Sequence, residues 1–236
     1  VSEIEILENG NKVIGSNRGE ILTNDGITIE ADNFIYKKIE NVINATGNVI
    51  IKDTINNFNI TSNNVTYEKN NEEIFSKGKT KGEFNSRFIF DSIDVTFLRN
   101  KKILSSDKNS SIIDNDEKTY LKLNKFSFSI DDELLKGEDI LVNLDYDLPQ
   151  NHKLFFESGI FDFKRRSFVA KDVQINLKKN IFNNLKNDPR LKGVSAESEN
   201  NITKVKKGVF TSCNDDTDCP PWVVTASEIT HDKNKK

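Results

Sequence analysis

The sequence predicts an all-β fold, an elongated stack of antiparallel strand pairs. Apolar and polar residues alternate along most of the chain, as expected for strands with one buried face. Three segments also share one pattern that ends on an aromatic residue, and these aromatics, Tyr36, Tyr67 and Phe97, follow one another at steps of 31 and 30 residues. A fixed period of this size is typical of stacked supersecondary units, none of which buries its apolar face alone.

The first copy of the pattern contains a change of side-chain parity. Ile27, Ile29 and Ala31 share one strand face, and Phe34 then begins an alternation of the opposite parity. Side-chain direction along a strand has a period of two, so the change predicts a bulge or corner at 32–33. Asp and Asn suit such a corner because their side chains satisfy nearby backbone groups.

The next two copies repeat this change. It separates Phe58 and Ile60 from Val65 and Tyr67, and it separates Phe88 and Phe90 from Ile93, Val95 and Phe97. Each unit is therefore expected to be a bent pair of strands. Stacking the bends would give two facing sheets with apolar residues between them.

Later copies are weaker, and the composition then changes. Leu121 and Leu123 precede Phe126 and Phe128, and a further set of alternating residues follows Leu154. Polar segments at 69–72, 99–102 and 106–109 read as turns, and 181–185 as one helical turn. We predict a repeat domain over 1–183, a linker over 184–205 and a cysteine-containing terminal segment over 206–236.

Charge and hydropathy exclude several classes of protein. The net charge is 34 − 37 = −3, so no global basic field exists to attract nucleic acid. No run of eighteen apolar residues occurs, so no helix is expected to cross a membrane. The start at Val1 instead of Met suggests a processed or excised chain.

The sequence contains no catalytic constellation, and it predicts neither a cofactor nor a metal site. The two histidines, His152 and His231, lie far apart in polar settings. Cys213 and Cys219 could form a disulfide with each other, pair with cysteines outside this chain or remain thiols. These alternatives stay open on sequence alone.

The remaining signal is the population of 16 Phe residues and the apolar residues that alternate with them. They could fill a closed sandwich core or line a trough for an apolar ligand, and periodicity does not separate the two. The candidate lining residues are Phe34, Tyr36, Phe58, Ile60, Val65, Tyr67, Phe88, Phe90, Val95, Phe97, Phe126 and Phe128.

Several motifs resemble a known family. The pattern Ala-Asp-x-Phe-x-Tyr at 31–36, followed by Ala-x-Gly-Asn-Val at 45–49, resembles the OstA-type unit of lipopolysaccharide transport proteins. Asp-Pro-Arg-Leu-Lys-Gly at 188–193, Gly-Val-Phe-Thr-Ser-Cys at 208–213 and the segment 222–232 are similar to the end of the periplasmic domain in the LptD family of outer-membrane assembly proteins.

The resemblance implies a V-shaped β-jellyroll, open along one side, whose apolar trough holds the acyl chains of lipid A. It also implies a non-enzymatic role at the periplasmic face of the outer membrane. The N-terminal strands, over 4–14 and 21–31, would pair with an LptA-like bridge protein. A barrel with an LptE-like lipoprotein would follow Lys236.

The resemblance also bears on the cysteines and on the alternatives. Members of the family tie this domain to the barrel through disulfides, and Cys213 matches the cysteine of their Thr-x-Cys motif. Cys219 has no assigned partner, so the pairing stays open. The alternatives are a soluble LptA-like bridge protein and, from a different class, a structural β-solenoid such as an adhesin.

Overall fold

The computed structural model describes residues 3–148, 151–177, 187–213 and 222–232, and it confirms the all-β class. Within these ranges the regular structure consists of strands and two short 3-10 turns, without an α-helix. The elements are β1 (Glu3–Leu7), η1 (Glu8–Gly10), β2 (Lys12–Ser16), β3 (Gly19–Leu22), β4 (Ile27–Ala31), β5 (Asn33–Lys37), β6 (Val42–Asp53), β7 (Phe58–Glu68), β8 (Glu73–Phe84), β9 (Phe88–Leu98), η2 (Arg99–Lys101), β10 (Ile103–Ser106), β11 (Ser110–Asp114), β12 (Thr119–Leu123), β13 (Lys125–Ser129), β14 (Leu134–Leu144), β15 (His152–Asp162), β16 (Ser167–Asn176), β17 (Arg190–Glu199), β18 (Ile202–Thr211) and β19 (Val224–Asp232).

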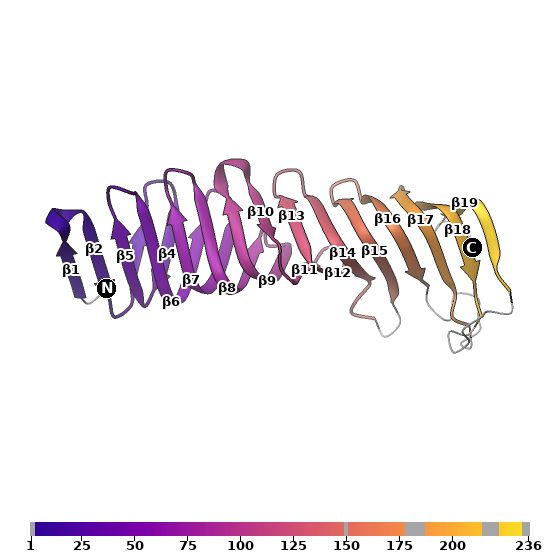
Figure 1. Cartoon of the computed structure of the whole chain (residues 1–236), viewed down its shortest axis with the longest axis horizontal. Helices are drawn as coiled ribbons and strands as arrows, with labels where there is room; N and C mark the ends of the chain where they lie inside the picture. Colours follow the sequence, from indigo (N-terminus) through magenta and orange to yellow (C-terminus); the bar gives the residue numbers. More distant parts are fainter. Residues whose placement is uncertain (1–2, 149–150, 178–186, 214–221, 233–236) are drawn as a thin grey trace. The chain divides into compact units, whose positions relative to one another are not determined.

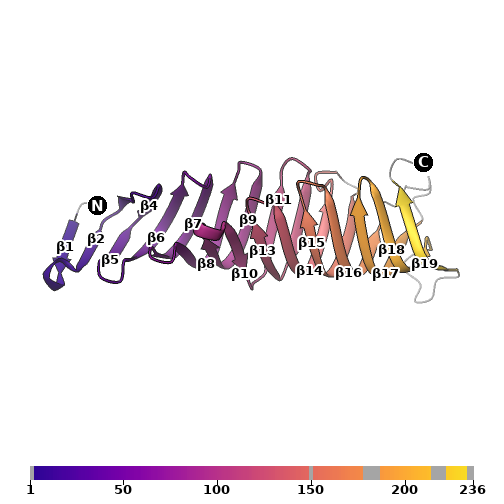
Figure 2. The same ribbon diagram turned by 90° about the horizontal axis from the view of Figure 1, so that it is seen from above.

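The chain divides into two compact units. Unit 1 comprises Val1–Ile112 with Ser127–Ile130, and unit 2 comprises Ile113–Phe126 with Asp131–Lys236. In unit 1 the long strands β6 to β9 pair antiparallel in succession. In unit 2 the strands β14 to β19 do the same. Figures 1 and 2 show these strands side by side within each unit, joined by turns at alternate ends.

The long strands bend where the sequence predicts a change of parity. Along β7, Phe58 and Ile60 are buried before the bend, and Val65 and Tyr67 are buried after it. The pairing of β7 with β8 shifts register between Ser62 and Asn64. At this shift residues 78–79 of β8 oppose the single residue 63 of β7, so the extra residue lies in β8. In β7 the two successive residues 63 and 64 are exposed, which changes the parity, and both halves of the strand present apolar side chains to the same interior.

Left-handed backbone accompanies these bends. Gly47 and Asn48 have φ of +77° and +45° where the β6–β7 register shifts, and Gly78 has +85° where the β8–β9 register shifts. Opposite Gly78, Asp94 has φ +53° and its Oδ1 accepts a 2.7 Å hydrogen bond from the Gly78 N–H. Glycine, Asn and Asp adopt this conformation at the lowest cost. In unit 2, Asp139 holds the same kind of position.

Two sequence-based assignments need correction. Ile93 was grouped with the inward residues Val95 and Phe97, but it is 38% exposed. The bulge lies at Asp94, so Ile93 still follows the parity of the first half of β9 and points outward. The predicted linker at 184–205 also contains a strand, because β17 pairs with β16 on one side and β18 on the other. The Ser and Glu residues of β17 are typical of a loop in the sequence. In the structure they occupy exposed or half-buried positions of the sheet.

The N-terminal segments form hairpins. Residues 4–14 hold β1 and β2 with η1 between them, and residues 21–31 hold β3 and β4. The expected helical turn at 181–185 lies outside the described residues. The repeat domain over 1–183 and the terminal segment over 206–236 stay predictions.

The bend at Asp94 generates a test of backbone strain. Replacing Asp94 by Ala or by Gly removes the same hydrogen bond, but only Ala keeps a Cβ in left-handed backbone, which costs about 1–2 kcal/mol. We therefore expect Asp94→Gly to be more stable than Asp94→Ala in chemical denaturation. At exposed Asp91 of the same strand, with ordinary φ, we expect the reverse order, because Gly weakens a strand interior. The same order at both positions would contradict the assignment of the bulge.

Candidate functional site

The predicted lining residues of unit 1 form a closed aromatic interior in this structure. All of them except half-buried Tyr36 are buried. The ring centroids of Phe58 and Phe97 lie 4.4 Å apart, and those of Phe58 and Phe90 lie 6.0 Å apart. The ring of Phe84 lies 4.7 Å from that of Phe128. The interior of unit 1 is therefore filled by the protein's own side chains.

A glycine makes room for one of these rings. A Cβ at Gly82 would meet the ring of Phe90 at 2.3 Å and the backbone oxygen of Asn59 at 2.6 Å. Real Cβ atoms do not approach so closely, so Gly82 has to remain glycine for Phe90 to lie flat against β8. The local sequence thus determines where the large ring fits.

Unit 2 has a more accessible interior. Phe156 and Phe161 are buried, and their ring centroids lie 5.3 and 5.7 Å from the ring of Phe168. Phe161 also stacks on Phe163 at 6.5 Å. Phe168 and Phe163 are only half-buried, unlike the rings at the centre of unit 1. An aromatic surface that belongs to the interior therefore reaches solvent here. Predicted lining residue Phe126 belongs to unit 2 and is buried.

A hollow of about 510 Å³ lies in unit 2, and Phe168 is part of its lining. Ile160, Val169 and Ile202 also line it, and all three are exposed. An ion pair between Lys204 and Glu197, 4.0 Å apart, lies in the same lining. The hollow therefore adjoins the half-buried aromatic surface of unit 2.

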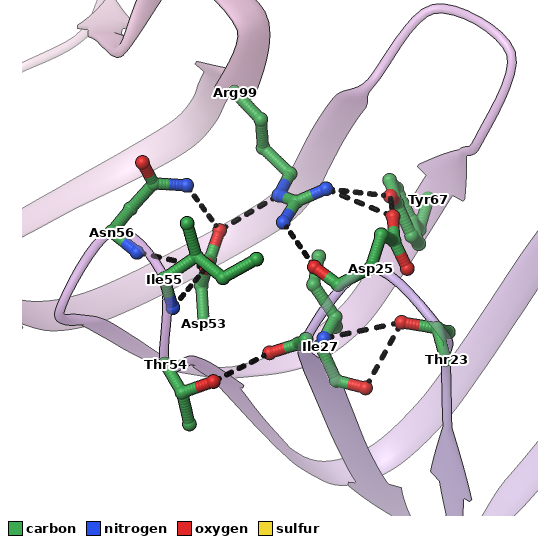
Figure 3. Close-up of polar contacts among 10 residues, drawn as sticks. Thr23, Asp25, Ile27, Asp53, Thr54, Ile55, Asn56, Tyr67 and Arg99 are labelled. Atoms are coloured by element: carbon green, nitrogen blue, oxygen red, sulfur yellow. Dashed lines mark hydrogen bonds and ion pairs between the residues drawn. The ribbon is translucent and has the colours of Figure 1, made fainter.

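Arg99 is the centre of a buried polar cluster in unit 1 (Figure 3). It lies in η2, and its side chain is 4% exposed. Its Nε donates to Asp53 Oδ2 at 2.7 Å, and its Nη1 donates to Asp25 Oδ2 at 2.9 Å and to the Tyr67 hydroxyl at 3.0 Å. Its Nη2 donates to the carbonyl oxygen of Asp25 at 2.8 Å. The Tyr67 hydroxyl itself donates to Asp25 Oδ2.

The cluster shifts the pKa values of its members. Burial by itself raises the pKa of Asp25, but hydrogen bonds from Thr23 and Tyr67 and the charge of Arg99 outweigh it, so this pKa lies below its ordinary value. Burial and the hydrogen bond to Asp25 raise the pKa of Tyr67. Burial lowers the pKa of Arg99, but the Asp53 carboxylate more than offsets this, so Arg99 is firmly cationic.

Sequence reasoning missed this cluster. Segment 99–102 reads as a polar turn, which it is, but nothing in the sequence singles out Arg99 within it. Its partners lie far earlier in the chain: Asp53, 46 positions before, ends β6, and Asp25, 74 positions before, lies in another polar turn. Their spacing carries no motif, so only the fold brings them together.

The three motif segments near the C-terminus lie on neighbouring strands. Arg190 of β17 donates from Nη1 to the carbonyl oxygen of Cys213 at 2.8 Å, and Thr211 of β18 donates to the carbonyl oxygen of Trp222 at 2.9 Å. Cys213 is half-buried and forms no disulfide with another described residue. Cys219 lies outside the described residues, so its pairing stays a prediction.

In the part of the chain that the structure describes, no group of three or more His, Cys, Asp or Glu residues could hold a metal ion. Among the same residues, no helix is long and apolar enough to cross a membrane.

Comparisons with known proteins give a likeness to solved structures. No family model and no curated protein matches this chain. Among solved structures, the chain is similar to LptH of Pseudomonas aeruginosa, described as the LptA-homologous periplasmic component of the lipopolysaccharide transport device. The TM-score is 0.42 at 16% identity, over 49% of this chain and 86% of that chain. A likeness at this level carries no functional argument, so function has to be inferred from the interior and the motif segments.

The lowered pKa of Asp25 generates a test. A carboxylate whose pKa is lower in the folded state stabilises the fold above its unfolded pKa of about 3.9, and this contribution is lost as pH falls through the folded value. We therefore expect the wild type to be more stable than Asp25→Asn at neutral pH, with the difference shrinking below about pH 4. Urea denaturation between pH 7 and pH 2.5 measures it. A difference that is constant across this range would contradict the role of the Asp25 charge.

Proposed function

We propose that this chain is the periplasmic lipid-conducting domain of a lipopolysaccharide-assembly protein of the LptD type. It receives lipopolysaccharide from a periplasmic bridge and passes the acyl chains along an apolar path toward the outer membrane. The observation that carries the proposal is the half-buried aromatic surface of Phe163 and Phe168, which continues the interior of unit 2 to solvent. A core that serves stability alone has no need of such a surface.

The chemistry of this interior suits sliding acyl chains. Between β14 and β18 the buried residues are apolar apart from Gly137, Gly208, Thr203 and Thr211. Burying a methylene yields about 0.8 kcal/mol without directional demands. An acyl chain would therefore bind well overall and move between near-equivalent positions, whereas hydrogen bonds to the lipid would hold it at one place.

The lining predicted for unit 1 belongs to the same proposal. Residues such as Phe58, Phe90 and Phe97 pack against one another at distances typical of aromatic pairs. Contacts of this kind involve no hydrogen bonds, so acyl chains could replace them when the two sheet halves part. In this proposal the closed interior of unit 1 is its empty state, and the path forms around the lipid.

The motif segments favour an LptD-type protein over a soluble bridge protein. Segments 188–193, 208–213 and 222–232, which resemble the end of the LptD periplasmic domain, lie together on β17, β18 and β19. A soluble bridge protein of the same pathway needs no such cysteine-bearing block. Cys213 would then be available for a disulfide, either with Cys219 or with a cysteine of the barrel.

The bridge protein would dock on β1. This strand pairs with β2, and its side chains are mostly exposed, Ile4 at 61% and Ile6 at 66%. An exposed strand with apolar side chains is a template for another chain to continue the sheet through backbone pairing. The periplasmic location and the partnership with an LptE-like lipoprotein follow from the same proposal.

Site-specific photo-crosslinking tests the lipid path. A photoreactive amino acid at Phe168, on the inner face of β16, should capture lipopolysaccharide in cells that express the full-length protein. The same group at Phe155 is the matched control, because Phe155 is exposed on the outer face of β15 and is not part of the lining of the hollow. Equal capture at both positions, or capture at Phe155 alone, would contradict an interior path.

A second crosslinking experiment tests the docking strand. The photoreactive group at Ile6 should capture a partner of LptA type, because strand addition places the neighbouring chain against β1. Ile55, 69% exposed in a turn of unit 1, serves as the control. If both positions capture the partner equally, β1 is not the specific docking edge.

A further inference from the structure

The turns of unit 1 form two rows, which we call rim one and rim two. Rim one comprises the turns at 38–41, 69–72 and 99–102, linked by backbone hydrogen bonds from Lys69 N to Asn41 O and from Arg99 N to Glu72 O. Rim two comprises the turns at 23–26, 54–57 and 85–87, linked from Thr54 N to Gly26 O and from Asn85 N to Asn57 O. Each long strand runs from one rim to the other. The rims are therefore the two free margins of the bent sheet.

Arg99 spans the two rims. It belongs to rim one, whereas both of its acidic partners lie on rim two. Asp25 lies in the turn at 23–26, and Asp53 directly precedes the turn at 54–57. Figure 3 shows the guanidinium reaching between the two carboxylates. Beneath it, Phe97 of the rim-one side contacts Phe58 of the rim-two side, with ring centroids 4.4 Å apart. The interior of unit 1 is thus closed at this place by one ion cluster over one aromatic contact.

The acidic partners of Arg99 on rim two also have other contacts. Asp53 accepts hydrogen bonds from its own turn, from the N–H groups of Ile55 and Asn56 at 3.1 and 3.0 Å and from Asn56 Nδ2 at 2.7 Å. These hydrogen bonds remain if Arg99 leaves, but the Asp53 charge then loses its counter-ion, and its side chain is 0% exposed until the rims part. The Asp25 side chain is 36% exposed, although its Oδ1 is buried.

We propose that Arg99 is a latch that holds the two rims of unit 1 together and controls sideways access of acyl chains to its interior. The aromatic contact beneath it is non-directional and can be exchanged for acyl chains at similar free energy. The charge-assisted hydrogen bonds of Arg99 are directional and have no counterpart in a lipid tail. These hydrogen bonds therefore set the free-energy difference between the closed and the open state. This inference rests on the proposed function.

The first test measures the distance between the two rims in the absence of lipid. Spin labels are attached through unnatural amino acids at exposed Ile55 of rim two and Lys101 of rim one, which leaves the native cysteines untouched. Pulsed electron paramagnetic resonance should give one narrow distance for the wild type and a longer, broader distribution for Arg99→Gln. Lys81→Gln is the matched control, because it removes an exposed cation of unit 1 that pairs with Asp91 across β8 and β9. An unchanged distribution in folded Arg99→Gln would show that packing and the remaining Tyr67–Asp25 hydrogen bond close the rims without Arg99, and it would overturn the latch.

Removing one partner of a buried ion pair is often strongly destabilising, so a milder variant is needed. Asp25→Asn keeps Arg99 and its bond to Asp53 and weakens one arm of the latch. It should widen the distribution less than Arg99→Gln does, while circular dichroism stays unchanged. Widening in neither variant would again overturn the proposal.

The second test adds the lipid and separates the latch from the proposed function. A photoreactive group at Phe90 should capture lipopolysaccharide several-fold more in Arg99→Gln than in the wild type. Open rims without increased capture at Phe90 would overturn the role of the latch in lipid access. Capture at Phe168 is the independent readout, because it reports on the lipid path of unit 2 and fails only if the proposed function fails.

Discussion

The fold depends on one constraint: a strand that bends must keep its apolar face inside. Side chains alternate with a period of two, so a strand crossing from one sheet half to the other needs an extra residue at the corner. In β7 the parity changes at 63–64, opposite the extra residue of β8, and in β9 the chain turns at Asp94. Without these corners, Val65 and Tyr67 would face solvent.

The two units use this construction differently. In unit 1 the rings interlock, and Arg99 ties the margins together with hydrogen bonds to two carboxylates. In unit 2, Phe163 and Phe168 leave part of the aromatic surface uncovered. Packing forces have no preferred direction, whereas hydrogen bonds do, so the polar cluster can govern opening while the rings provide the binding surface. Under the proposed function, this division would separate a specific closure from a non-specific interior in which lipid tails can slide.

The sequence predicted what depends on local pattern. The all-β class and the corner between Ile60 and Val65 follow from alternation along single strands, and the structure confirms both. Ile93 was misplaced because two neighbouring apolar residues, one on each side of the corner, look alike in a pattern. Strand β17 was missed because its Ser and Glu residues resemble loop when the sheet beside them is unknown. The Arg99 cluster joins turns that are distant in the chain, and no periodicity predicts which turns meet.

The turn rows have a consequence for how such chains change over generations. Within each rim, one hairpin is joined to the next by the same main-chain bond, as from Lys69 to Asn41 and from Asn85 to Asn57. The bond uses no side chain, so any sequence compatible with a turn can supply it. Whole hairpin pairs could therefore be duplicated or deleted without redesign of their neighbours. Lineages could adjust their number in this way, although left-handed joint residues such as Asn41 and Asn57 limit which side chains are accepted there.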